Sequence, residues 1–334
     1  MTKKTLSLIS LLIIPLHSAA DITTDGTVGP ALNLQGPNFQ IDQSIGTRTG
    51  NNLFHSFGQF NLSNQQSATF TGDNNLQNVI SRVTGGQVSS INGLLKSEIS
   101  QAGFYFINPA GIIFGDNAKV DVPAAFYAST AAKLNFADGT SFDAINPQGS
   151  QLTMATPDSF GFTRDQTGQI TITADGLVFK PATKVNFNSQ SINIEQAEIT
   201  GEGIQLQLIA NGQQDQDINI QTLPDHSLQG EINIEQSSID VYGNGTEQLQ
   251  IRGGSTTIQD STLFAVNIGS INHTDALAVD VKVTSLQLDN SQLINGVLGS
   301  GNAGSMSVNS DGLLSVLNGG AIRSSTFALG DAGS

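Results

Sequence analysis

The chain contains no cysteine, so no disulfide framework can stabilise its fold. Charged residues are also scarce, at 12% of the 334 residues, or about half the share of an average globular protein. Asn, Gln, Ser and Thr supply the polarity instead, which excludes a charge-driven disordered chain and favours stacked polar side chains. The net charge is −15. This excess of acids argues against binding to nucleic acid or to an anionic membrane, because both attract basic surfaces.

Long apolar runs are absent after residue 20, and none approaches the roughly 20 residues that span a bilayer. The start of the chain has the parts of a secretory signal peptide: lysines at 3–4, an apolar core at 6–16, and small residues at Ser18 and Ala20. We expect cleavage before Asp21 and a mature chain that lies outside the cytoplasm without inserting into a membrane. The lack of cysteine fits this route, since an oxidising periplasm would close disulfides in a chain that must still cross a second membrane.

No cluster of catalytic or metal-binding residues is evident in the sequence. Beyond the signal segment, His55, His226 and His273 stand far apart and lack the paired spacing of metal ligands. His55 has apolar neighbours on both sides, so we expect it at the edge of the core. The dispersed acids are typical of turns, and the three basic residues of 185–334 are scattered: Arg252, Lys282 and Arg323. The sequence thus predicts no catalytic residue, no metal site and no cofactor.

Short repeats fill the second half of the chain. Ile192–Gln196 has the sequence Ile-Asn-Ile-Glu-Gln, which recurs 40 residues later at Ile232–Gln236. A looser form, in which alternating apolar residues precede polar residues and then Ser or Gly, occurs at three further places: Thr256–Leu263, Leu286–Leu293 and Leu314–Ile322. These repeats predict short strands joined by Gly, Asn and Asp turns, without helical periodicity. We predict an all-β fold, a right-handed parallel β-helix with on the order of 11 to 15 coils.

Other features divide the chain. The turn-rich residues 21–52 are expected to cap the first coil, because an open strand edge needs cover. Fifteen of the 17 phenylalanines lie before residue 190, so we place an organisational boundary near residue 185. Leu134–Phe142 contains a central Asp-Gly pair and predicts a small hairpin outside the helix. Gly301–Ser305 begins to recur at the end of the chain, from which we expect a longer exoprotein.

The segment Phe104–Phe114 organises the chain. Its aromatic and β-branched runs predict two strands. Between them, Asn108, Pro109, Ala110 and Gly111 have the signature of a type I turn. On local chemistry alone this is a tight corner in an all-β core.

Three further segments accompany this one, and the four occur in this order: Ser56–Asn61, Ile80–Gly86, Asn108–Gly115 and Val120–Ala131. Together they resemble the N-terminal secretion domain of two-partner-secretion exoproteins over roughly residues 21 to 145. This domain is also called the haemagglutination activity domain of filamentous haemagglutinin-like adhesins. Two departures are present, because Ala110 replaces the second Asn of the usual Asn-Pro-Asn-Gly-Ile motif and Asp73–Leu76 lacks the proline of an earlier motif. Which transporter subtype would recognise the domain therefore stays open.

With the signal segment, the change in aromatic content and the repeats, the resemblance gives three predicted parts: a signal peptide at 1–20, a secretion domain with its cap at 21–185, and β-helix repeats at 186–334. It implies that the chain is the secretion module of a large exported β-helical exoprotein. This module would target the exoprotein to an outer-membrane β-barrel transporter with periplasmic domains. Asn108, Pro109, Gly111 and Ile112 match the family motif, and they are candidates either for recognition by the transporter or for nucleating the fold.

We further expect a monomer that crosses the periplasm of a Gram-negative-type envelope and is secreted or displayed at the cell surface. The whole protein would act as an adhesin or haemagglutinin on a host or neighbouring cell. The alternatives are a carbohydrate-active β-helical enzyme and another secreted effector scaffold. A groove with aligned acids would favour the enzyme, whereas a smooth shaft lined by Asn and Thr would favour the scaffold.

Overall fold

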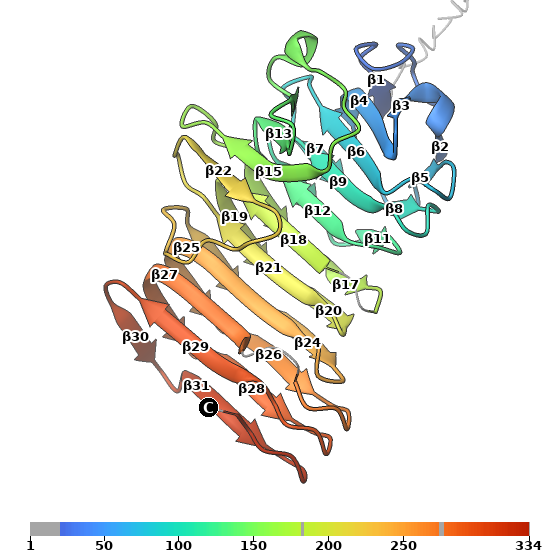
Figure 1. Ribbon diagram of the computed structural model, residues 1–334. Helices are drawn as coiled ribbons and strands as arrows, with labels where there is room; N and C mark the ends of the chain where they lie inside the picture. Colours follow the sequence, from blue (N-terminus) through green and yellow to red (C-terminus); the bar gives the residue numbers. More distant parts are fainter. Residues whose placement is uncertain (1–20, 182–183, 274–276, 334) are drawn as a thin grey trace, which may run out of the picture.

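The computed structural model describes residues 21–181, 184–273 and 277–333, so the predicted signal peptide at 1–20 lies outside the described residues. Within these ranges the chain forms strands, turns and two single-turn 3₁₀ helices, η1 (Gln43–Ile45) and η2 (Pro147–Gly149). In this described part, no helix is long and apolar enough to span a membrane. The strands wind into a parallel β-helix whose coils stack from the blue end to the red end of Figure 1. The predicted fold class is confirmed.

Strand pairing defines three faces of the helix. Face 1 consists of β4 (Asn52–Phe60), β6 (Asn78–Val83), β9 (Gly103–Ile107), β12 (Phe126–Ser129), β18 (Lys184–Ser189), β21 (Gln205–Ala210), the first part of β25 (Gln248–Gln259), the first part of β27 (Leu277–Asp289) and β29 (Ser305–Ser310). Face 2 consists of β7 (Ser89–Ile91), β10 (Ile112–Phe114), β16 (Gln169–Ile172), β19 (Ser191–Glu195), β23 (Ile232–Glu235), the second parts of β25 and β27, and β30 (Leu314–Leu317).

Face 3 is formed by two parallel sheets of four and six strands. The first sheet contains β2 (Asn38–Asp42), β5 (Ser67–Thr71), β8 (Leu94–Ser97) and β11 (Lys119–Asp121). The second contains β17 (Asp175–Phe179), β20 (Glu198–Glu202), β24 (Ser238–Gly243), β26 (Thr262–Asn267), β28 (Gln292–Val297) and β31 (Ala321–Thr326). The ten strands of this face correspond to about ten coils in the described residues, fewer than the 11 to 15 expected. Residues 130–168 and 211–231 contain segments that leave the helix. The expected number was too high because it counted these residues as parts of coils.

The sequence repeats stack in register, as predicted. Ile192 pairs with Ile232, and Glu195 pairs with Glu235. Farther along face 2, Leu286 pairs with Thr256 on one side and with Leu314 on the other.

The predicted stacking of polar side chains is also present. Asn233 Nδ2 donates to Asn193 Oδ1 at 3.0 Å, across two coils. At a neighbouring corner, Ser237 N donates to Ser261 Oγ and Ser261 N donates to Ser291 Oγ, both at 3.0 Å. These polar groups are therefore satisfied by the equivalent residue of the next coil.

Apolar side chains fill the interior of the helix. In the early coils these are mainly rings, and Phe57, Phe70 and Phe104 meet edge to face at centroid distances of 4.7 to 6.2 Å. The ring stack continues to Phe179 and Phe187, after which Ile, Leu and Val dominate the core. The strand ladder crosses this change without a break, because β18 pairs with both β12 and β21. The division at residue 185 thus marks a change of packing, and as a domain boundary it stays a prediction.

The first coil is covered by antiparallel strands, as expected of a cap. β1 (Ile22–Thr24) and β3 (Thr47–Thr49) both pair antiparallel with β4. Their pairing covers backbone groups of the first face-1 strand that would otherwise present an open edge.

A four-stranded antiparallel sheet lies along one side of the helix (Figure 1). It consists of β13 (Lys133–Phe136), β14 (Ser141–Asp143), β15 (Pro157–Phe162) and β22 (Gln216–Asn219). β13 and β14 form the predicted hairpin, with Leu134 opposite Phe142. The sheet packs through Phe136, Phe142 and Phe160 onto outward-facing residues of face 1 such as Phe54 and Tyr105. β15 and β22 were not predicted, because their pairing joins segments far apart in sequence.

Candidate functional site

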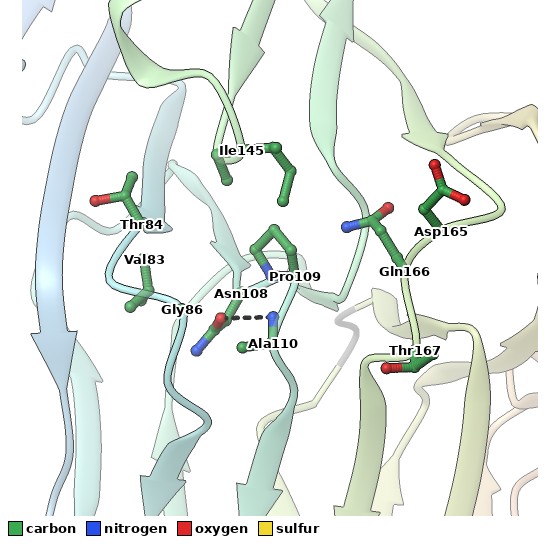
Figure 2. A pocket seen from close by; sticks show the side chains of 11 residues that line it. Val83, Thr84, Gly86, Asn108, Pro109, Ala110, Ile145, Asp165, Gln166 and Thr167 are labelled. Carbon is green, nitrogen blue, oxygen red and sulfur yellow. Dashed lines mark hydrogen bonds between the residues drawn. The ribbon is translucent and has the colours of Figure 1, made fainter.

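The predicted turn forms between β9 and β10. Gly111 N donates to Asn108 O at 3.0 Å, which closes the four-residue turn. Asn108 Oδ1 accepts from Ala110 N at 3.0 Å, the dashed line of Figure 2, and this bond fixes the start of the turn. Gly111 has φ 127°, a backbone conformation that L side chains rarely adopt. The motif therefore needs glycine at its last turn position for a conformational reason.

Asn108 connects three successive coils. Its side chain is fully buried, and Nδ2 donates to Gln87 O and to Ser89 Oγ of the preceding coil, both at 2.9 Å. Its backbone N donates to Ser129 O of the following coil at 2.9 Å. Both side-chain amide atoms thus have partners in the folded protein.

The other three motif residues are also buried. Pro109 packs closely against Gly168, in the loop that returns to face 2. The approach is so close that a Cβ atom added to Gly168 would stand only 2.3 Å from Pro109 O. Ile112 points into the core and pairs with Ser89 on one side and Ile170 on the other. The structure brings the four predicted residues together at one corner, but in the folded state it exposes little of them to a partner.

A groove of about 290 Å³ lies at this turn. Figure 2 shows the side chains that line it. Val83, Thr84 and Gly86 form one wall, residues 165–167 form the opposite wall, and Ile145 overhangs it from the extra-helical sheet region. Asp165 is its one acidic lining residue. Pro109 and Ile145 give the groove an apolar surface that a partner could contact. Its lining residues do not include a nucleophile paired to a base, as a catalytic site would need.

Arg82 is a buried residue that sequence reasoning did not single out. On β6, it donates through Nε to Ser56 Oγ at 2.8 Å and through a terminal nitrogen to Thr27 Oγ1 at 2.8 Å. Toward the extra-helical sheet it donates to Asp143 O at 2.6 Å, bonds Ser150 Oγ, and stands 3.9 Å above the Phe142 ring.

The guanidinium of Arg82 therefore joins the cap, the first coils and the extra-helical sheet. Burial lowers the pKa of Arg82 to about 10, although the charges of Asp25 and Asp143 oppose the shift. It stays protonated at neutral pH and keeps all its donors. The sequence did offer one signal, because Arg82 lies inside the strand-forming run Val79–Val83. An arginine that is buried in such a strand needs hydrogen-bond partners.

His55 was expected at the edge of the core, and the structure buries it fully, beside Phe57 and Phe70. His226 is exposed beside Asp225, and His273 Nε2 lies 2.6 Å from Glu247 O. Among the described residues, no group of three or more His, Asp or Glu side chains could hold a metal ion.

The burial of His55 predicts a pH-dependent stability. Burial lowers the pKa of His55 from 6.5 to about 4, partly opposed by Asp42. The unfolded chain therefore binds a proton at His55 more readily than the folded chain does. The contribution of buried His55 to stability is complete above about pH 6.5 and is lost as the pH falls toward 4. This shift corresponds to about 3 kcal/mol. We expect the difference in unfolding free energy between wild type and His55→Leu to change by about this amount from pH 7 to pH 4.

Urea denaturation at several pH values measures this difference. His226→Ala is the matched control, because its side chain is 65% exposed, and it should follow the wild-type profile. Parallel profiles for wild type and His55→Leu would contradict the prediction.

Comparison with known proteins identifies the family. The sequence model of the TPS secretion domain matches residues 20–324, which is most of the chain. The chain belongs to this family. Over 96% of its length it is similar to the solved HMW1 secretion domain from Haemophilus influenzae, of which 98% is covered, at 16% identity and a TM-score of 0.42. No curated protein matches the chain.

As a TPS secretion domain, the chain is the secretion module of a two-partner-secreted exoprotein. Domains of this family interact with an outer-membrane transporter partner, and their proteins are secreted or lie at the cell surface. The family is a secretion module rather than a family of enzymes. The resemblance derived from the sequence motifs is thus confirmed.

Proposed function

We propose that this TPS secretion domain targets its exoprotein, on its way through the periplasm, to the outer-membrane transporter. Closure of the coils outside the cell would then oppose the return of the chain through the transporter. Asn108, Pro109, Gly111 and Ile112 would act in this process by fastening the early coils. The observation that carries the proposal is the buried Asn108 side chain, which bonds to the corner of the preceding coil. Such bonds exist only after the coils have stacked.

Recognition by the periplasmic domains of the transporter is the other expected role of these residues. It would act on the chain before the coils close, since the folded state buries all four residues. An extended segment could then add a strand to a sheet edge of the transporter through backbone bonds. The two roles differ in what they predict for a well-folded variant.

We expect Asn108→Ala to destabilise the purified domain by about 3 kcal/mol, because the buried Ser89 hydroxyl would lose its partner and the bonds to Gln87 O and from Ala110 N would be lost with it. Secretion with the partner transporter should fall with the lost stability and recover at lower temperature. Urea denaturation and the amount of secreted protein are measured together, with Asn117→Ala as the control, because Asn117 makes a similar corner bond but is exposed. A stable Asn108→Ala or Pro109→Ala variant that is not secreted at any temperature would indicate recognition instead.

Adhesion to a host or neighbouring cell is a second candidate function of the whole exoprotein. It is favoured by a polar cleft on the outside of face 1, where a surface ligand could bind. The enzyme alternative needs aligned acids, but Asp280 in this cleft is paired with Arg252. We therefore propose a binding role for this surface rather than a hydrolytic one.

A further inference from the structure

A polar cleft of about 340 Å³ lies on the outside of face 1, far along the chain from the Asn108 corner. Its floor is formed by residues of β18, β21, β25 and β27, and its wall by residues 221–225 from the excursion that follows β22. Most of the lining side chains carry amide or charged groups: Lys184, Gln205, Gln207, Gln221, Asp225, Gln248, Gln250, Arg252, Asp280 and Lys282. We propose that this cleft binds an uncharged oligosaccharide.

The floor presents a column of amides in register. Asn186 pairs with Gln207, Gln207 with Gln250, and Gln250 with Asp280 on successive strands, which are about 4.8 Å apart. Asn186 Nδ2 donates to Gln207 Oε1, and Gln207 Nε2 donates to Gln250 Oε1, both at 2.8 Å. Asn186 and Gln207 are buried behind the partly exposed Gln250, so these bonds fix the orientation of the amide that Gln250 presents to the cleft.

The wall of the cleft is held by cations from three different strands. Lys184 Nζ donates to Ile220 O at 2.6 Å, Arg252 Nε to Pro224 O at 2.7 Å, and Lys282 Nζ to Asp225 O at 3.0 Å. The fold thus gathers basic residues that the sequence leaves scattered. Their bonds to loop carbonyls give them a structural role in the wall, and Arg252 is also paired with Asp280. The carbonyl bonds leave the charges of Lys184 and Lys282 in place, but Asp225 and Asp280 line the same cleft, so an anionic ligand would meet carboxylates as well as cations.

An unpaired buried acceptor lies at the end of the amide column. Asp280 is 7% exposed, and its Oδ1 atom is buried without a hydrogen-bond partner in the described structure. A buried carboxylate oxygen without a donor is costly, so a side-chain adjustment that brings Asp280 Oδ1 to the cleft would let a ligand hydroxyl supply that donor. Hydroxyl groups also accept hydrogen bonds from amides such as that of Gln250. A polyhydroxylated, uncharged ligand therefore matches both the acceptor and the donors of the cleft.

Other classes of ligand match this surface less well. The lining is mainly polar, which disfavours an apolar ligand, and the net charge of −15 disfavours nucleic acid. The floor belongs to interior strands of a continuous ladder, so a peptide cannot add to it as an edge strand. The inference does not depend on the export role, because it concerns the folded chain after secretion.

The test applies the purified secreted chain to an array of neutral and acidic oligosaccharides, followed by calorimetric titration of the best binder. We expect a neutral oligosaccharide to bind. Gln205→Ala and Gln250→Glu should each weaken binding about 3- to 10-fold, since each removes one net hydrogen bond or its donor. Both side chains are partly exposed, and Gln250→Glu retains an oxygen for Gln207. Gln259→Ala, on the same β25 strand but on face 2, is the matched control and should bind like wild type.

Several outcomes would overturn the proposal: no oligosaccharide bound at millimolar concentration, selective binding of acidic glycans, or equal binding by wild type and both floor variants. Circular dichroism of each variant checks that the fold is intact. The secretion assay with Asn108 variants is a separate measurement, so failure here leaves the proposed export role standing.

Discussion

Replacement of Arg82 with methionine is expected to lower the free energy of unfolding of this TPS secretion domain by about 3 kcal/mol or more. Methionine replaces the aliphatic stem of arginine but has no donors, so Ser56, Thr27 and Asp143 O would lose a charged partner at once. The contact with the Phe142 ring would also lose its cation–π component. Urea denaturation of the purified protein measures the loss.

The same substitution should loosen the extra-helical sheet before it affects the later coils. Arg82 bonds Asp143 O, Ser150 Oγ and Pro147 O, all near β14 and η2. We expect limited proteolysis to cut the variant in residues 144–156 faster than wild type. Arg82→Lys should be intermediate, because it keeps the charge but cannot reach every acceptor.

Arg48→Ala is the control for this prediction. Arg48 pairs with Asp73 at 2.6 Å, but both side chains are at least one-third exposed, and such surface pairs contribute about 0–1 kcal/mol. An Arg82→Met protein with the wild-type urea midpoint and proteolysis pattern would show that the guanidinium contributes little.

The position of Arg82 also explains why local sequence predicts only part of this structure. Its hydrogen-bond partners lie 26 to 68 residues away along the chain, in three different units of the fold. A strand pattern around Val79–Val83 predicts the strand but not these partners. The gathering of Lys184, Arg252 and Lys282 in the polar cleft has the same origin, since coil stacking and an excursion decide which residues meet.

Features that repeat locally were predictable. Ile192–Gln196 and Ile232–Gln236 share a sequence, and stacked coils align equivalent residues, so their pairing follows from the pattern. The turn at Asn108 was predictable for a different reason, because Asn, Pro and Gly each have a defined place in it. Its connections to Gln87 and Ser129 were not, since they depend on coil length.

The aromatic core gives the second large expected effect, which concerns Phe126. Its ring lies between coils, with centroid distances of 6.2 Å to Phe104 and Phe114, 6.0 Å to Phe179 and 6.3 Å to Phe187. These partners belong to all three faces, so truncation at this position opens a cavity that no single strand can close. We expect Phe126→Ala to lower the free energy of unfolding by about 3–5 kcal/mol.

Phe126→Leu should recover much of this loss, because the cavity is smaller and the later coils are already packed with aliphatic residues. Phe264→Ala is the matched control, since Phe264 lies on the outer side of β26 and is partly exposed, so its truncation should cost much less. Urea denaturation of the three variants tests the prediction. Equal losses for Phe126→Ala and Phe264→Ala would mean that the ring stack does not stabilise the early coils more than ordinary surface burial does. In that case, coil closure at the aromatic end could not supply the free energy that opposes return through the transporter.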